Sequence, residues 1–273
     1  MKKHVLAPLG IIFIISYTSI AYAQINFVGP PLITPEMRLG PELIKLLDKI
    51  EARSNTLKSF QADMLFEQQQ LLIETVTIRK GQTYYQADDK RVQFRIHFDD
   101  WLQKDREEDI TSIKPTVYDE DVVFDGMWLT LLNARTKSGR KQEISKIPHN
   151  KEAFRLGKGD IPLPFAIQKN DIIKEFDVNL VPTDPKKPET LKEPAYHLFL
   201  KPKKDGSFAE KYVALELWIS EKTTLPLRIR YRANDDEITT VTWSEIQADK
   251  GINPKTFEIT VPAGWDIETV PLK

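Results

Sequence analysis

The residues of this sequence that could carry catalysis or bind a metal are few and far apart. Its histidines are His4, His97, His149 and His197, and they form neither an H-x-H nor an H-E-x-x-H pattern that would bind zinc. His97 falls on the polar side of a predicted strand, which indicates an exposed strand residue. The sequence has no cysteine and no G-x-S-x-G motif, so it offers no cysteine nucleophile and no nucleophile elbow. We therefore predict no enzyme, no metal site and no cofactor.

Two charged groups surround one predicted hairpin. Asp119–Asp121 and Asp125 could bind a hard cation, but they lack the alternating ligands and the glycine of a calcium loop, so we interpret them as a solvated turn. The basic stretch of residues 135–141 is either a turn that protects a sheet edge or a docking point for an anionic partner. Paired carboxylates of a hydrolase can be distant in sequence, so scattered acids leave that class open.

The elements that would position these residues begin with a helix. Its apolar residues recur at three- and four-residue steps, which is typical of an amphipathic helix. They are Leu43, Leu46, Leu47, Ile50 and Leu57. From residue 59 onwards the period changes to two, which is typical of strands with one apolar face. The alternating apolar residues are Phe60, Ala62, Met64 and Phe66, followed by Val92, Phe94, Ile96 and Phe98.

A run of strands joined by short polar turns predicts an antiparallel sheet. Asp125-Gly126 is a strong hairpin signal, and further strands follow from residue 195 to the end. The stretches 149–171 and 182–194 predict short helical pieces and a surface loop. So long a sheet must curl, and its apolar concave face needs a cover. We predict an α+β protein in which a curled antiparallel sheet forms an open half-barrel, covered on its concave face by helices.

The first 23 residues have the pattern of a secretory signal peptide. Two lysines precede an apolar stretch that ends in Ala21-Tyr22-Ala23, an A-x-A cleavage box. We predict cleavage after Ala23, an extended lead-in at 24–36 and a single domain at 37–273, in a periplasmic protein. The formal net charge of −1 provides no field that would attract nucleic acid.

The order of these elements resembles the outer-membrane lipoprotein carrier family, the LolA-like proteins. The matching stretches are Leu57–Ala62 after the helix, the hairpin Phe124-Asp125-Gly126, Phe257–Ile259 and Pro262–Trp265. The resemblance implies a half-closed barrel whose cavity carries the acyl chains of lipoproteins. It also implies a monomer without enzymatic activity that is at most peripheral to membranes. Its implied partners are lipoprotein or lipid cargo, an inner-membrane export complex and an outer-membrane acceptor.

The alternation of side chains along the strands and this resemblance together suggest a set of ligand-binding residues. The predicted cavity lining is Phe60, Met64, Phe66, Phe94, Ile96, Phe98 and Trp128, and the predicted lid residues are Leu43, Leu47 and Ile50. Family members often carry Arg-Pro near the start of the third strand, where this sequence has no proline. Lys90 or Arg91 could replace that arginine in cargo transfer or docking. The aromatic positions that the family places after the hairpin are Thr130 and Leu132 here, and Trp128 keeps their parity.

The carrier function predicts an apolar cavity of several hundred Å3 or more under the helices. One alternative is an envelope sensor or protein-interaction module on the same half-barrel. Another is a secreted hydrolase, which would place clustered carboxylates in a polar cleft.

Overall fold

The computed structural model describes residues 40–88, 91–105, 115–147, 151–158, 163–182 and 191–272. The predicted signal peptide, the lead-in at 24–36 and Lys90 lie outside the described residues, as does most of the predicted loop at 182–194. Among the described residues, no helix has the length and apolar character needed to cross a membrane.

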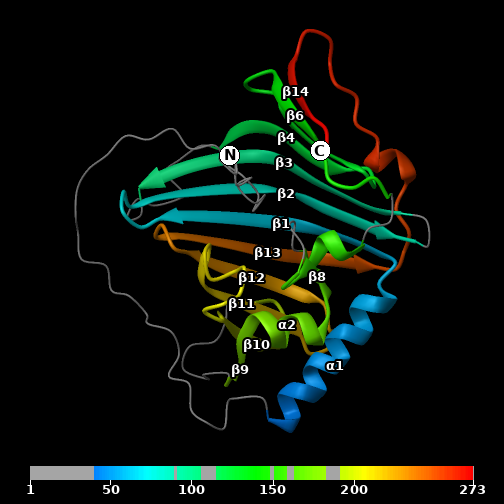
Figure 1. The fold of residues 1–273 in the computed structure, drawn as a ribbon. Coiled ribbons are helices and arrows are strands. Elements are labelled where there is room, and N and C mark those ends of the chain that lie inside the picture. Colours follow the sequence, from blue (N-terminus) through cyan, green and yellow to red (C-terminus); the bar gives the residue numbers. More distant parts are fainter. Residues whose placement is uncertain are drawn as a thin grey trace, which may run out of the picture.

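Most of the described chain forms one 12-stranded sheet, which curls and stays open (Figure 1). Its strands, in spatial order, are β14 (Asp266–Val270), β6 (Ser138–Glu143), β5 (Trp128–Asn133), β4 (Thr116–Phe124), β3 (Val92–Asp105), β2 (Thr75–Ala87), β1 (Ser59–Gln70), β13 (Glu237–Ala248), β12 (Pro226–Ala233), β11 (Tyr212–Ser220), β10 (Ala195–Pro202) and β9 (Phe176–Val181). Neighbouring strands are antiparallel, except that β14 pairs with β6 in parallel. The predicted antiparallel sheet is confirmed.

The hairpin between β4 and β5 forms where the sequence predicts it. Gly126 has a φ of 117°, which a residue with a side chain rarely adopts. The Asp125 carboxylate accepts hydrogen bonds of 2.9 Å from the backbone N–H groups of Met127 and Trp128. These bonds fix the turn, and the turn fixes the register of β5 against β4.

The elements outside the large sheet are short, apart from one helix. They are α1 (Pro41–Thr56), the 3-10 helix η3 (Lys151–Phe154), the parallel strand pair β7 (Arg155–Leu156) and β8 (Leu163–Ile167), α2 (Lys169–Glu175) and the 3-10 helix η4 (Pro254–Phe257). We call α1, η3, β7, β8 and α2 together the cover. In Figure 1, β8 and α2 lie in front of the sheet, and α1 runs beside them.

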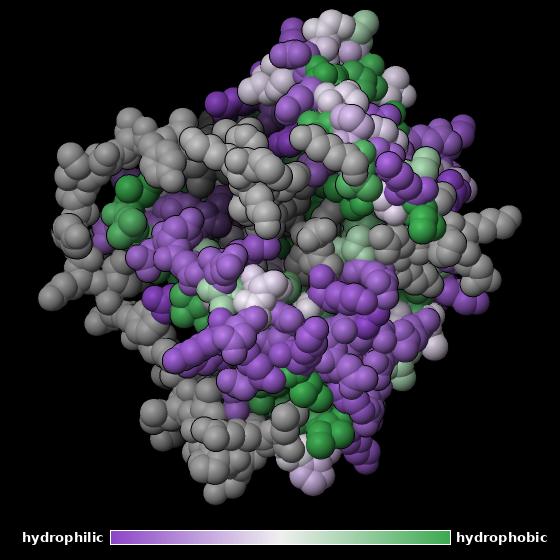
Figure 2. Space-filling model, in the orientation of Figure 1, coloured by the Kyte–Doolittle hydropathy of each residue, from purple (hydrophilic) through white to green (hydrophobic). Residues whose placement is uncertain are grey.

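The helix α1 has the amphipathic pattern that the sequence predicts. Its buried residues are Leu43, Leu46, Leu47 and Ile50. Pro41 occupies the first turn, where a backbone N–H has no partner within the helix. Over α1 and α2 the outer surface is mainly hydrophilic (Figure 2). The apolar stripe of α1 is therefore buried inside the protein.

Three sequence interpretations that concern these elements need correction. Asp119–Asp121 lie within β4 and not in a turn. Arg140 and Lys141 lie in β6, which is paired on one side with β5 and on the other with β14, so the basic stretch is only partly a turn. The cover is also less helical than predicted, because the strand pair β7–β8 takes part in it.

Candidate functional site

One face of the sheet, which we call the inner face, carries a continuous row of apolar side chains. The row runs across five strands through direct partners: Phe60 with Tyr85, Tyr85 with Phe94, Phe94 with Phe124 and Phe124 with Leu129. Directly paired residues project from the same side of a sheet. All five side chains are buried and belong to the main hydrophobic cluster.

Most of the predicted ligand-binding residues meet at this face. Phe60, Met64, Phe66, Phe94, Ile96 and Phe98 are buried in the same cluster as the helix residues Leu43, Leu47 and Ile50. The period-two pattern of β1 and β3 therefore placed them on one side of the sheet. That they contact a ligand stays a prediction.

Trp128 is the exception, and its predicted place on the inner face is wrong. Its neighbour Leu129 is the partner of Phe124, so Trp128 projects from the opposite face. There the Lys141 ammonium lies 5.1 Å from the centre of the Trp128 ring. Because β5 is apolar on both sides, its pattern does not show which side faces inward. Trp128 was placed by its even spacing from the family's aromatic positions, and that spacing indicated the wrong side.

Aromatic side chains of the cover close the inner face. The Phe165 ring of β8 lies 5.1 Å from that of Phe60 and 4.7 Å from that of Tyr85, measured between ring centres. The Phe154 ring of η3 lies 4.7 Å from that of Phe124. Sequence reasoning missed these two phenylalanines, because each stands in a short stretch without a recognisable period.

Polar contacts hold the parts of the cover to one another. The Ser54 hydroxyl of α1 accepts a hydrogen bond of 3.2 Å from the backbone N–H of Ile167. The Gln168 amide donates to the Asn55 side chain at 2.7 Å, and Lys169 pairs with an aspartate of α1. The helix α1 and the segment from β8 to α2 therefore form one connected layer.

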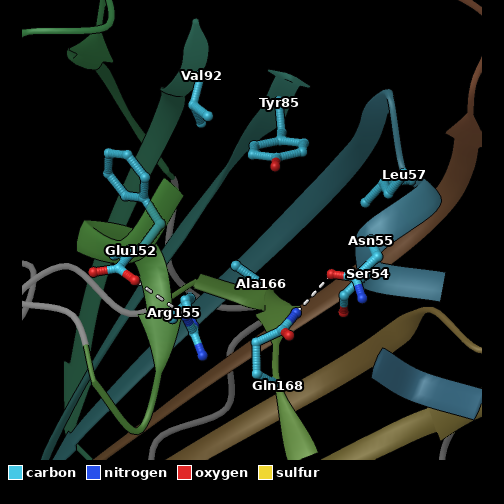
Figure 3. Close-up of a pocket in the computed structure, with 10 residues that line it drawn as sticks. Ser54, Asn55, Leu57, Tyr85, Val92, Glu152, Arg155, Ala166 and Gln168 are labelled. Atoms are coloured by element: carbon cyan, nitrogen blue, oxygen red, sulfur yellow. Dashed lines mark hydrogen bonds and ion pairs between the residues drawn. The ribbon is translucent and has the colours of Figure 1, made fainter. Parts of the chain in front are cut away.

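A pocket opens where the end of α1, η3 and β8 meet the ends of β2 and β3 (Figure 3). Its volume is about 200 Å3, so it is smaller than the predicted cavity of several hundred Å3. It is lined by Ser54, Asn55, Leu57, Tyr85, Val92, Glu152, Phe154, Arg155, Ala166 and Gln168. The pocket combines apolar walls with a few polar groups, which is the usual composition of a small-molecule site.

Tyr85 is the residue of this pocket that also belongs to the inner-face row. Its side chain is buried, and the hydroxyl oxygen points into the pocket (Figure 3). Burial raises the pKa of Tyr85 to about 12, so the phenol stays protonated at neutral pH. Its hydroxyl makes no hydrogen bond to any residue that the structure describes.

A buried ion pair also faces inward, and sequence reasoning missed it. The Arg79 guanidinium lies 3.5 Å from the Glu120 carboxylate, and 5.7 and 5.4 Å from the ring centres of Phe66 and Phe98. Both residues occupy positions that alternate inward along their strands, because Glu120 pairs with Phe98 and Arg79 pairs with Phe66. Ion pairs of this kind are costly to break, because a charge remains buried when one partner is removed.

The opposite face of the sheet holds a cluster of His97, Asp119 and Asp121, whose ligand atoms lie within 4.8 Å of one another. His97 is half-buried and paired, so the interpretation as a plainly exposed residue is wrong. Arg95 occupies both oxygens of Asp121, at 2.6 and 2.9 Å. A guanidinium already balances the carboxylate that a metal would need, so this arrangement fits an ion-pair network.

The proposed docking residue Arg91 is exposed and lies in the turn between β2 and β3. Its backbone N–H donates to the Asp88 carboxylate at 2.9 Å. A part of Arg91 in docking stays a prediction.

No family model and no curated protein matches this sequence. Among solved structures, MucB is 12% identical with a TM-score of 0.47, over 84% of this chain and 66% of that chain. LprF from Mycobacterium bovis is 12% identical with a TM-score of 0.42, over 84% and 99%. A LolA superfamily protein from Nitrosomonas europaea is 11% identical with a TM-score of 0.33, over 79% and 97%. Since these TM-scores are below 0.5, we base the functional proposal on the geometry of this chain.

Proposed function

We propose that this protein is a carrier that binds the acyl chain of a lipoprotein or of a related lipid between the inner face and the cover. The observation that supports the proposal is that the inner face and the cover meet through apolar side chains. The sheet presents a continuous apolar row, and a separate layer meets it through aromatic rings such as Phe165 on Phe60. Apolar surfaces of this kind accept an acyl chain as readily as they accept each other.

The energies suit a reversible carrier. A chain of twelve methylenes gains about 10 kcal/mol when it leaves water. Part of this gain is offset, because the chain must first separate the cover from the sheet and so expose apolar rings. The remainder stays well below the affinity ceiling of roughly 20 kcal/mol. The closed cover therefore lowers the affinity to a range in which cargo can be released.

The described polar links between cover and sheet lie near the ends of the cover. At one end, Arg53 of α1 pairs with Asp249 at 2.8 Å. At the other, the Lys203 ammonium donates to the backbone carbonyl of Ile173 at 2.5 Å. Such an arrangement allows the middle of the cover to lift while both ends stay attached. In this proposal the protein works in the periplasm, takes cargo at the inner membrane and passes it towards the outer membrane.

A second candidate is a sensor or protein-interaction module on the same fold. It is favoured by the closed contact of Phe154 and Phe165 with the inner face, beside which the pocket of Tyr85 has a volume of about 200 Å3. In that case the cover would be a permanent part of the core, and the partner would bind outside it.

The deciding experiment is site-specific photo-cross-linking in cells. A photoreactive amino acid replaces Phe94 on the inner face, and a matched variant carries it at Trp128, an aromatic residue on the opposite face. The carrier proposal predicts that acylated molecules cross-link at position 94 and not at 128, as read by mass spectrometry. Protein partners at 128, with no acylated species at 94, would favour the interaction module and contradict the carrier.

A further inference from the structure

The side chain of Tyr85 carries a hydroxyl, whereas its neighbours in the inner-face row are apolar. Its partners in the inner-face row, Phe60 and Phe94, carry no polar atom, and Phe165 of the cover contacts its ring. Only 5% of Tyr85 is exposed, and no described residue forms a hydrogen bond with its hydroxyl. The hydroxyl oxygen is not among the fully buried polar atoms that lack a partner, so it faces the open space of the pocket, where a ligand atom can reach it. A phenylalanine would fill the same space but would offer no hydrogen-bond donor to the pocket.

The pocket around this hydroxyl carries balanced charges. Arg155 pairs with Asp171 at 2.5 Å and with Glu152 at 3.4 Å, and Lys158 pairs with Glu152 at 3.0 Å. The cations of this wall are therefore matched by carboxylates, so an anion gains little by entering. The pocket suits a neutral group that accepts a hydrogen bond.

We propose that the pocket binds the carbonyl group of an acyl ester or amide, with the Tyr85 hydroxyl as hydrogen-bond donor. This inference rests on the proposed carrier function and names the part of the ligand that this site selects. A carbonyl oxygen accepts one hydrogen bond from a phenol that stays protonated, and it carries no charge that would need a counter-ion. The acyl chain attached to it continues over the inner face.

The dimensions agree with this assignment. A volume of about 200 Å3 equals roughly seven water molecules at 30 Å3 each, which holds an ester group and a few methylenes but not a whole chain. The rest of the chain must then take the place of the Phe165 ring on Phe60. Carbonyl recognition at the mouth of the pocket and opening of the cover are thus consecutive parts of one binding event.

The test compares three probes with the same chain: methyl dodecanoate, dodecanoate and dodecane. Each is delivered from cyclodextrin and displaces a fluorescent acyl probe from the full mature protein. We expect the wild type to bind the ester about tenfold more tightly than the alkane, the effect of one hydrogen bond in a buried site. We expect Tyr85→Phe to lose this preference and to bind the alkane as the wild type does.

Tyr84→Phe is the matched control, because Tyr84 is the chain neighbour of Tyr85 and projects from the opposite face. It should keep the tenfold preference. The thermal stability of unliganded Tyr85→Phe separates recognition from structure: a recognition group can be removed without loss of melting temperature, whereas a structural hydrogen bond cannot.

The outcomes distinguish the two proposals. An unchanged preference for the ester in Tyr85→Phe, or tighter binding of dodecanoate than of its methyl ester, would overturn this inference and leave the carrier function standing. If no probe binds to the wild type, both proposals are overturned.

Discussion

The imidazole of His97 is held between carboxylates on the opposite face of the sheet. Its Nδ1 lies 3.1 Å from Asp121, and its Nε2 lies 3.1 Å from Asp99. The hydrogen bond to Asp121 raises the pKa of His97, which burial and Arg95 only partly oppose. Burial would raise the pKa of Asp121, but hydrogen bonds from His97 and Arg95 lower it overall. Both shifts favour the charged pair in the folded protein.

These shifts give the stability a defined pH dependence. Because the pKa of His97 is higher in the folded state, its contribution is complete below the unfolded pKa of about 6.5 and is lost as the pH rises through the folded value. The contribution of Asp121 is present above its unfolded pKa of about 3.9 and is lost as the pH falls through its lowered folded value. The window in which both act is therefore mildly acidic.

We predict that His97→Asn destabilises the protein more at pH 5.5 than at pH 8.5. The loss should be about 1 kcal/mol at pH 5.5, the usual value for a charge-assisted hydrogen bond that is partly solvated. Chemical unfolding of both proteins at the two pH values measures it. An equal loss at both values would show that His97 acts through packing and not through its charge.

At the scale of elements, the cover depends on a few aromatic contacts. Phe165 is 3% exposed and rests on the rings of Phe60 and Tyr85. Phe257 in η4 is equally buried, at 3%, but lies outside the main cluster of the inner face. The two residues allow burial and position to be tested separately.

Phe165→Ala should lower the stability by about 3 to 5 kcal/mol and raise the affinity for an acyl probe, because the ring that competes with the chain has been removed. Phe257→Ala should lower the stability by a similar amount and leave the affinity unchanged. Unfolding curves and probe titrations on both variants measure these effects. If Phe165→Ala binds the probe more weakly, the ring belongs to the binding surface and is not its competitor.

For the whole molecule, the chain has no disulfides and relies on one large core between sheet and cover. A ligand that binds there should stabilise the folded state by mass action, by about 2.7 kcal/mol at a concentration of one hundred times Kd. We therefore predict that methyl dodecanoate raises the melting temperature. Methyl butanoate should not, since each lost methylene removes about 0.8 kcal/mol. Calorimetry with both esters checks this, and equal melting temperatures with and without the long ester would speak against an internal site.

The sequence by itself determined the elements and their rows. The helical period of α1 and the period of two that follows it reflect which side chains avoid water, so the buried stripe of α1 and the inward set from Phe60 to Phe98 were predictable. The Asp125-Gly126 turn was predictable as well, because few residues adopt its backbone. Local rules of this kind need no knowledge of the rest of the chain.

Only the tertiary structure decided which row of β5 faces inward, and so turned Trp128 away from the site. When a strand is apolar on both sides, the alternation of its side chains does not show which side faces inward. In β5 the pairing of Leu129 with Phe124 decides it. The contacts of Phe154 and Phe165, the pair of Arg79 with Glu120 and the pocket of Tyr85 join residues that are distant in the chain. The ion pair arises when β2 and β4 are brought together in the curled sheet, and the other contacts arise when the cover packs on that sheet.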